Sequence, residues 1–319
     1  MKKIKQHWLK ICIVFILLIT SMFVVSYFRN KNNCSSIAVI YIAGDIVSSP
    51  RYNDDGSLYK GDTVALDVIA QIRKVDKDKK VEAIVFAIDS AGGDSQSGEE
   101  ITRAIKEVKK PTVALIRGQG QSAGYRIATA TGRIFALDTS NTGAIGTTMS
   151  YVDNSKYNQE NGLTFNQLSS GKYKDMGNID KPITEDERKI MMKQVREFAD
   201  LFIKDVAKNR NLPIEKIRAL ADGATITASE ALKNGLIDEI GSFNEADIYL
   251  SKILKRNIQM CIPVKEIEKN NNYERSSAFC SERETGYNWA KENEISDSNE
   301  CKGNSESFIE GCVSYTREN

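Results

Sequence analysis

Apolar runs of strand length alternate with segments of helical periodicity along the central part of the chain. The strands predicted from the apolar runs are Ile37–Ile42, Val81–Ile88, Thr112–Ile116 and Arg133–Leu137. The helices predicted from the periodic segments are Thr63–Val75, Ser97–Lys109, Ser122–Thr131, Thr184–Lys208, Pro213–Ala221 and Ala228–Asn234. Strands that alternate with helices are typical of an α/β fold with parallel strand pairing.

Several residues mark where these elements begin and end. Pro111 stops the helix before the third strand, because proline lacks the backbone N–H that a helix interior needs. Thr184 and Glu187 have the spacing of a capping box and predict the start of the long helix. Gly235 is suited to the C-cap of the last helix.

An uncharged apolar segment, residues 11–28, precedes this pattern and predicts a transmembrane signal anchor. The preceding residues 1–10 contain several lysines and are predicted to stay in the cytoplasm, while residues 29–35 form a linker. Everything after residue 28 would then lie on the extracytoplasmic side of the cell membrane, as part of a single-pass protein. The alternative is that this segment is a cleaved signal peptide. The segment contains no Ala-x-Ala cleavage site, and Val24-x-Ser26 is the weaker substitute.

The composition changes again after the helical region, so the predicted domain ends near residue 260. Residues 261–319 are rich in Asn, Ser and Glu, with an acidic balance and few aliphatic side chains, which favours a polar tail. This tail contains Cys261, Cys280, Cys301 and Cys312, for which two disulfides and four free thiols remain alternatives.

Charge and histidine content exclude several classes of function. Lys and Arg number 44 against 43 Asp and Glu, so no basic excess suggests a nucleic-acid partner. The one histidine, His7, precedes the predicted membrane segment. A Ser-His-Asp triad, a Cys-His pair and histidine-ligated zinc are therefore excluded, and we predict neither a metal nor a cofactor.

Gly120–Gly124 (GQSAG) has the pattern G-x-S-x-G between a predicted strand and a predicted helix, where a nucleophilic serine would stand. Ser122 would need a base, and without histidine the remaining candidate is a lysine with a lowered pKa. Asp89–Asp94 (DSAGGD) follows the most apolar strand, so its glycine N–H groups are candidates for an oxyanion hole.

Five short segments, taken in order, resemble the signal peptide peptidase A family, which consists of membrane-bound Ser-Lys peptidases. They are Val81–Gly93, Gly120–Ala136, Thr142–Gly146, Ser170–Asp175, and Asp222–Gly223 together with Ala228–Gly241. The similarity covers approximately residues 36–255 and does not include the tail.

This resemblance implies a ClpP/crotonase-type α/β fold for a peptidase domain at 36–260. It implies Ser122 as nucleophile, Lys174 as general base, with Lys172 as its neighbouring rival, and Gly92 or Gly93 as oxyanion donor. It also implies a homo-oligomeric ring in which the lysine comes from the same or the neighbouring subunit. Ala91, Ala123 and Arg126 depart from the family pattern, and Arg126 is expected to add a charge near the pocket.

Together these observations predict a membrane-anchored serine endopeptidase that cleaves peptides, with spent signal peptides as candidate substrates. The alternatives are a non-catalytic peptide-binding membrane scaffold of the same fold and a crotonase-type acyl-CoA enzyme. The acidic tail is predicted to inhibit the active sites, to be trimmed by them, or to have no role.

Overall fold

The computed structural model describes residues 36–256, 258, 260, 293 and 301. The chain divides into two units, Met1–Met260 and Cys261–Asn319. The strands of the first unit are β1 (Ile37–Val47), β2 (Thr63–Val64), β3 (Ala83–Gly93), β4 (Thr112–Gln121), β5 (Arg133–Ala136), β6 (Asn141–Gly143), β7 (Thr225–Thr227) and β8 (Glu239–Ile240). Its helices are α2 (Ala65–Lys77), α3 (Ser95–Glu107), α4 (Ala123–Thr129), α5 (Ser155–Glu160), α6 (Glu185–Arg210), α7 (Ile214–Leu220), α8 (Ala228–Asn234) and α9 (Phe243–Leu254).

The main sheet is parallel and has the strand order β2-β1-β3-β4-β5-β8. The first part of β4 pairs with β5, and its last residues pair with β6. Strand β6 in turn pairs with β7 in the antiparallel direction. The carboxyl ends of β3 and β4 lie side by side, because Ser90 is the register partner of Gly120. Parallel strands place their carboxyl ends at one edge, so the two glycine-containing segments meet there.

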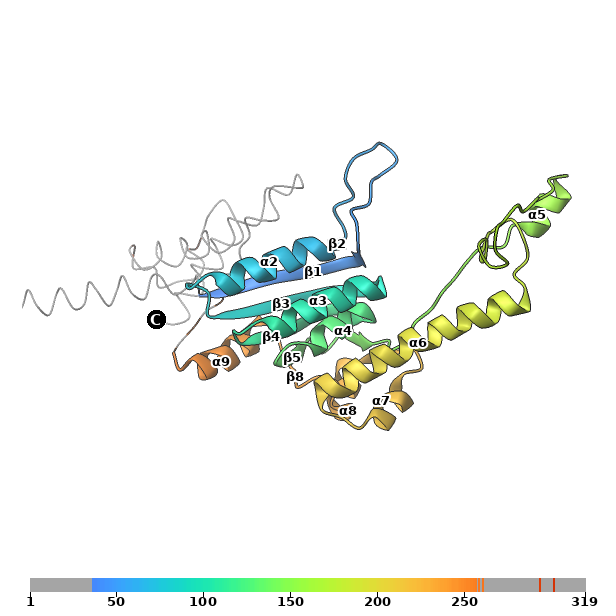
Figure 1. Cartoon of the computed structure of the whole chain (residues 1–319). Coiled ribbons are helices and arrows are strands. Elements are labelled where there is room, and N and C mark those ends of the chain that lie inside the picture. The colour runs from blue at the N-terminus through green and yellow to red at the C-terminus, as the bar shows by residue number, and fades with distance from the viewer. Residues whose placement is uncertain (1–35, 257, 259, 261–292, 294–300, 302–319) are drawn as a thin grey trace, which may run out of the picture. The chain divides into compact units, whose positions relative to one another are not determined.

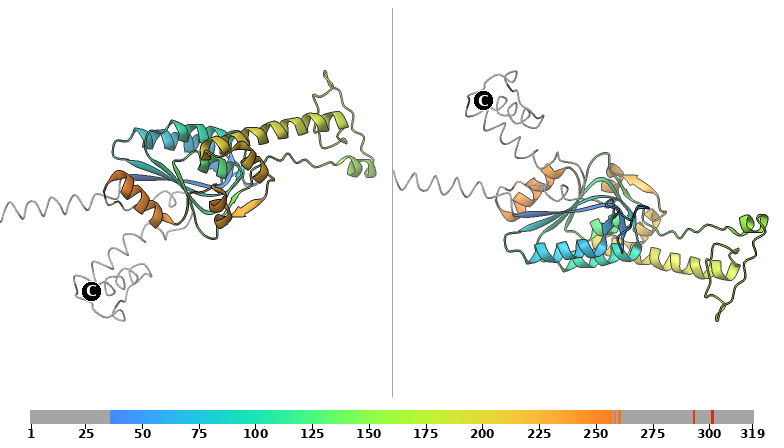
Figure 2. Two further views of the ribbon diagram at one scale, coloured as in Figure 1. Left: turned by 90° about the horizontal axis from the view of Figure 1, so that it is seen from below. Right: turned by 90° about the horizontal axis from the view of Figure 1, so that it is seen from above.

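Helices cover both faces of the sheet (Figures 1 and 2). Helices α2, α3 and α4 lie on one face, and α9 lies on the other. The larger apolar core lies under the first set and includes Ile42, Phe86, Ile88 and Tyr125, all of which are essentially inaccessible to water. A smaller core under α9 contains Val85, Leu115 and Phe135. The predicted α/β class is therefore confirmed.

The main differences from the predicted elements lie at the strand ends. We predicted strands ending at Ile42, Ile88 and Ile116, whereas β1, β3 and β4 continue to Val47, Gly93 and Gln121. The reason is that these polar and glycine-rich extensions pair with one another at the sheet edge, which local hydrophobicity does not reveal. The capping box of Thr184 and Glu187 and the left-handed C-cap at Gly235 are confirmed.

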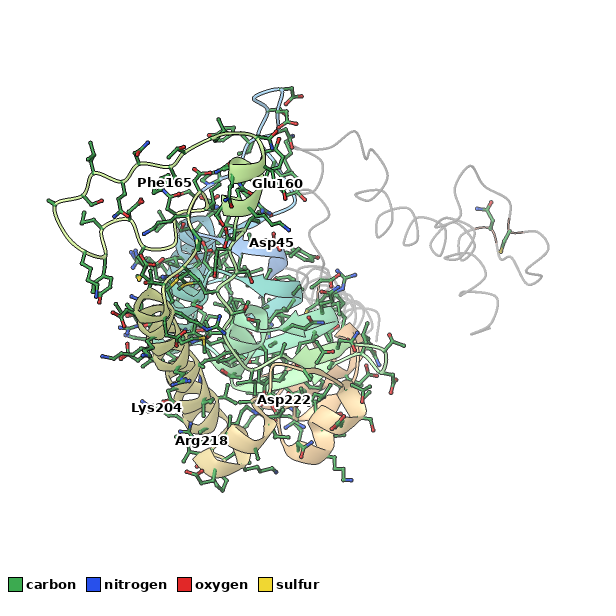
Figure 3. The ribbon with its side chains drawn as sticks, turned by 90° about the vertical axis from the view of Figure 1, so that its right-hand side faces the viewer. Asp45, Glu160, Phe165, Lys204, Arg218 and Asp222 are labelled. Carbon is green, nitrogen blue, oxygen red and sulfur yellow. The ribbon has the colours of Figure 1, made fainter. Side chains whose placement is uncertain are left out.

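An extended part of the chain, residues 149–198, projects away from the sheet and is named the arm (Figure 1). It contains α5 and the first half of α6, whose core contacts are made by its second half through Phe202, Ile203, Val206 and Ala207. Figure 3, which is seen from the end of the arm, shows Glu160 and Phe165 on it. The arm therefore depends on local polar contacts for its shape.

The predicted membrane segment, residues 11–28, lies outside the described residues. Within the described part of the chain, no helix is both long and apolar enough to cross a bilayer. Of the tail, the structure describes Asn293 and Cys301. Cys301 is buried and disulfide-bonded, so the free-thiol alternative is wrong for this residue.

Glu187 anchors the start of α6 inside the arm and provides a test of this local order. Its carboxylate accepts hydrogen bonds from the Thr184 N–H at 2.8 Å and from the Lys181 ammonium at 2.9 Å. The Thr184 N–H contributes most and Lys181 next to lowering the pKa of Glu187 from 4.5 to about 2. Glu187→Ala should therefore speed amide hydrogen exchange in residues 181–192 and leave β3 and β4 unchanged.

The stability of the arm should depend on pH for the same reason. Since the pKa of Glu187 is lower in the folded arm than in the unfolded chain, its carboxylate stabilises the arm fully above about pH 4.5. This stabilisation is lost as the pH falls towards about 2. Glu185→Ala is the matched control, because Glu185 is an exposed carboxylate in the same first turn. Equal exchange in the Glu187 and Glu185 variants would contradict this role.

Candidate active site

Ser122 stands at a sharp turn between β4 and α4, with φ 50° and ψ −121°. A positive φ is unfavourable for a residue with a Cβ atom and persists only where the surrounding structure enforces it. Here the Ser122 N–H donates to the Gly143 carbonyl at 2.9 Å, and its own carbonyl accepts from the Arg126 N–H at 2.9 Å. The turn is therefore fixed by β6 on one side and by the first turn of α4 on the other.

Gly92 lies directly against Ser122 at the end of β3. A Cβ atom added to Gly92 would lie 2.7 Å from the Ser122 Cβ and 3.2 Å from the Ser122 Oγ. Gly92 also has a φ of 117°, a conformation that side-chain-bearing residues rarely adopt. Glycine at 92 therefore lets β3 approach the serine this closely.

The two glycines differ in their surroundings. The Gly92 N–H donates to the Ser90 hydroxyl at 3.1 Å. Gly93 lines a cavity of approximately 580 Å³ together with Ser122. Of the two predicted oxyanion donors, Gly93 is thus the one that lines the cavity, and its role as a donor stays a prediction.

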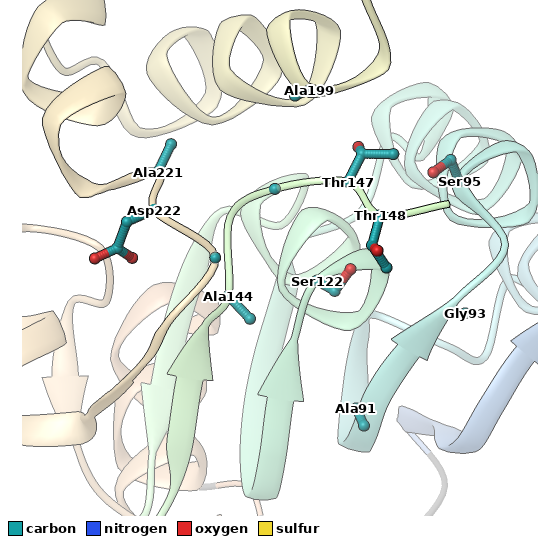
Figure 4. A pocket seen from close by; sticks show the side chains of 12 residues that line it. Ala91, Gly93, Ser95, Ser122, Ala144, Thr147, Thr148, Ala199, Ala221 and Asp222 are labelled. Carbon is teal, nitrogen blue, oxygen red and sulfur yellow. The ribbon is translucent and has the colours of Figure 1, made fainter. Parts of the chain in front are cut away.

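The cavity is lined largely by small side chains (Figure 4). Its lining residues are Ala91, Gly93, Ser95, Ser122, Ala144, Gly146, Thr147, Thr148, Ala199, Ala221, Asp222 and Gly223. Figure 4 shows Ser122 between Ala91 and Gly93 on one side and Ala144 on the other, with the Asp222 carboxylate pointing away. Among these described lining residues there is no lysine, arginine or histidine.

Lys174 is consequently not brought to Ser122 within the described part of one chain. It is an exposed residue in a turn of the arm, where its N–H donates to the Gly171 carbonyl at 3.1 Å. Lys172, the rival base, donates to Asp186 at 2.9 Å, and this hydrogen bond raises the pKa of Lys172 above its ordinary value. Lys172 is therefore engaged in an ion pair with Asp186 in this structure.

Arg126 lies beside the cavity, since its Nη1 donates to the carbonyl of the lining residue Ser95 at 3.3 Å. Its side chain does not line the cavity, is only 7% exposed and pairs with Asp205 of α6. Ala199 and Thr147 also line the cavity, although neither lies in a recognisable sequence motif. No cluster of histidine, cysteine and carboxylate side chains suited to a metal is present among the described residues.

Comparison with known proteins relates these features to a family. The model for peptidase family S49 matches residues 104–255, and the model for Clp protease matches residues 59–145. The two matches together span the β4–α4 turn that carries Ser122, the cavity residues and the arm. The Clp protease match agrees with the ClpP-like α/β architecture.

Individual relatives show the same similarity. A candidate signal peptide peptidase SppA of Enterococcus faecium is 31% identical over 181 residues, which are 56% of this chain and 53% of that protein. A candidate protease of Methanocaldococcus jannaschii is 29% identical over 76% of this chain and 81% of that protein. The solved structure of a ClpP1 mutant from Listeria monocytogenes matches 68% of this chain and 98% of its own, with 17% identity and a TM-score of 0.44.

The fold and the serine turn thus define an α/β chain of the Clp-protease-like class. Within that class, the chain is similar over residues 104–255 to peptidase family S49, and the Enterococcus relative, named as a signal peptide peptidase of type A, supports the same family. The aligned region spans about half the length of the Enterococcus relative.

The close approach of Gly92 gives a direct test of the site. Gly92→Ala should displace Ser122, because the added methyl group would overlap the serine Cβ. We expect the rate of Ser122 labelling by a fluorophosphonate probe to fall at least about 10-fold, since small displacements at a reacting atom cost about 100-fold in rate.

Gly56→Ala is the matched control, because Gly56 also has a positive φ but an added Cβ there would meet nothing within 4 Å. Labelling of the Gly56 variant should remain at the unmodified rate. Equal labelling of the Gly92 variant would argue against this geometry.

Proposed function

We propose that this chain is a serine endopeptidase in which Ser122 is the nucleophile and Lys174 is the general base. The observation that carries the proposal is the enforced backbone of Ser122, which presents its hydroxyl to a cavity beside Gly93. The match of residues 104–255 to peptidase family S49 supports this assignment. The reaction is hydrolysis of a peptide bond in an extended peptide.

In this proposal one proton moves between the serine, the lysine and the leaving group. The Lys174 amine takes the proton from the Ser122 hydroxyl while Oγ attacks the peptide carbonyl carbon. The oxyanion that forms accepts hydrogen bonds from backbone N–H groups, for which Gly93 and Ala123, the residue after the nucleophile, are the candidates. The lysine then returns the proton to the departing amine, and water releases the acyl group by the reverse sequence.

The lysine is proposed to come from the arm of a neighbouring protomer. Two observations support this arrangement: no basic side chain lines the cavity among the described residues, and Lys174 is exposed on a projecting arm. The arm also exposes apolar side chains that a second copy of the chain would cover. The most exposed of these are Val152, Tyr157, Leu163 and Leu168.

Assembly of several copies into a ring would place each arm at the next cavity. The Clp protease similarity supports such an assembly. We further propose that residues 11–28 anchor the chain in the cell membrane with the ring on the extracytoplasmic side. Peptides released at the membrane, including spent signal peptides, would then be the substrates.

Complementation between two inactive variants tests the shared site. Ser122→Ala should reduce peptide cleavage at least about 1000-fold, and Lys174→Ala by about 10²–10⁴-fold. When the two variants are co-expressed in equal amounts, random mixing gives each site a chance of about one in four of receiving both an intact serine and an intact lysine. Cleavage of a fluorogenic peptide set should therefore recover to about a quarter of the unmodified rate.

The outcomes separate the alternatives. Failure to recover activity in verified mixed oligomers would show that the lysine acts within its own chain. Retained activity in Lys174→Ala would remove this lysine from the mechanism. An unmodified chain that is folded and assembled, yet cleaves no peptide, would favour a peptide-binding scaffold.

A further inference from the structure

Arg126 forms a buried ionic link between the helix that follows the nucleophile and the two helices beside it. Its Nε and Nη2 atoms donate to Asp205 Oδ2 of α6 at 2.9 and 2.6 Å. Its Nη1 donates to the Ser95 carbonyl of α3 at 3.3 Å, and Nη2 donates to Glu99 at 3.4 Å. A charge this well buried persists because all these acceptors face it.

Each of the three elements joined by this guanidinium supplies a wall of the cavity. Helix α3 supplies Ser95, α6 supplies Ala199, and Ser122 is the N-cap of α4. The backbone of Arg126 is involved as well, since its N–H donates to the Ser122 carbonyl. One residue thus contacts the nucleophile through its main chain and the cavity walls through its side chain.

Helix α4 is buried along all seven residues, and the Tyr125 hydroxyl donates to the Leu236 carbonyl at 2.8 Å. Its directed contacts with α6 are those of Arg126 and a hydrogen bond from Asn209 Nδ2 to Thr129 Oγ1 at 2.9 Å, which lies at the far end of α4 from Ser122. Helix α6 is held in the core by its own apolar residues Phe202, Ile203 and Val206. The ion pair of Arg126 therefore ties α4 to α6 nearer to Ser122 than the Thr129 hydrogen bond does.

We propose that Arg126 is a positioning residue for catalysis, which holds Ser122 in its reactive conformation by tying α4 to Asp205, Ser95 and Glu99. This inference rests on the proposed peptidase function. Arg126 does not touch the substrate, since it lies behind the cavity wall. Its loss should lower the rate of the chemical step and leave substrate binding nearly unchanged.

The chain offers matched controls for the test. Arg210 of α6 is also a buried arginine, 8% exposed, and its Nη2 donates to Asp238 at 2.7 Å, away from the residues that line the cavity. Arg103 pairs with the same Glu99 from an exposed position. Arg210→Met reports how much kcat and Tm change when a buried ion pair is lost. Arg103→Met reports how much they change when Glu99 loses its other arginine partner.

The kinetic experiment compares these variants in the full-length chain. Arg126→Met should lower kcat for a fluorogenic peptide by about 10- to 100-fold with KM changed less than about 3-fold. Arg126→Lys, which retains the charge, should recover part of kcat. Arg210→Met and Arg103→Met should keep kcat within about 3-fold, even where Arg210→Met lowers Tm as much as Arg126→Met.

The opposite results would overturn the proposal. It fails if Arg126→Met retains kcat, or if Arg210→Met loses kcat equally at the same Tm. Should Arg126→Met not fold, Arg126→Lys and Asp205→Asn become the decisive variants, with a loss of kcat expected in both.

Amide hydrogen exchange separates this proposal from the proposed function. If the unmodified chain has no Ser122-dependent cleavage, the peptidase assignment fails, and exchange in residues 122–129 then decides the role of Arg126. Faster exchange there in Arg126→Met but not in Arg210→Met supports positioning of Ser122. Unchanged exchange in that segment overturns it.

Discussion

The enforced positive φ at Ser122 is the constraint on which the rest of the site depends. A serine in this conformation costs about 1–3 kcal/mol, which the surrounding structure must offset. The pairing of β4 with β6 fixes the residue before it, and the hydrogen bond from Arg126 fixes the turn after it. Gly92 leaves the space into which the serine projects. The parallel sheet contributes by bringing these segments to one edge.

The geometry of one chain also explains why its cavity and its candidate base are separate. Half of α6 belongs to the core, and the other half carries residues away from it together with exposed apolar side chains. Exposed apolar side chains that gather on one projecting segment are typical of a surface that contacts another protein. The described lining of the cavity has no basic side chain, and the arm carries the exposed Lys174. A second copy of the chain would bring a lysine to the cavity and would cover the apolar side chains of the arm.

The sequence predicted the alternation of strands and helices well, because buried runs such as Val81–Ile88 and amphipathic segments such as Ser97–Lys109 have strong local signatures. It placed Ser122 at a strand–helix turn, which the structure confirms. It did not predict β6 or the extension of β3 through Gly93, since those strands form by pairing with distant segments and contain few apolar residues. It placed the charge of Arg126 near the pocket but did not predict its burial, because the acceptors that draw it into the interior, above all Asp205, lie as far as 79 residues along the chain.

The buried Arg126 behind Ser122 carries a desolvation cost that its ion pairs and hydrogen bonds must offset. An apolar side chain in the same place would fill the space without desolvating a charge, and replacement of buried ion pairs by apolar residues is often neutral or stabilising. Apolar contacts, however, tolerate rotation of a short helix, whereas the directed hydrogen bonds from Arg126 to Asp205 and Ser95 have a defined geometry. We therefore expect the pair to contribute more to the orientation of α4 than to the stability of the fold, and the positive φ of Ser122 at the start of α4 depends on that orientation.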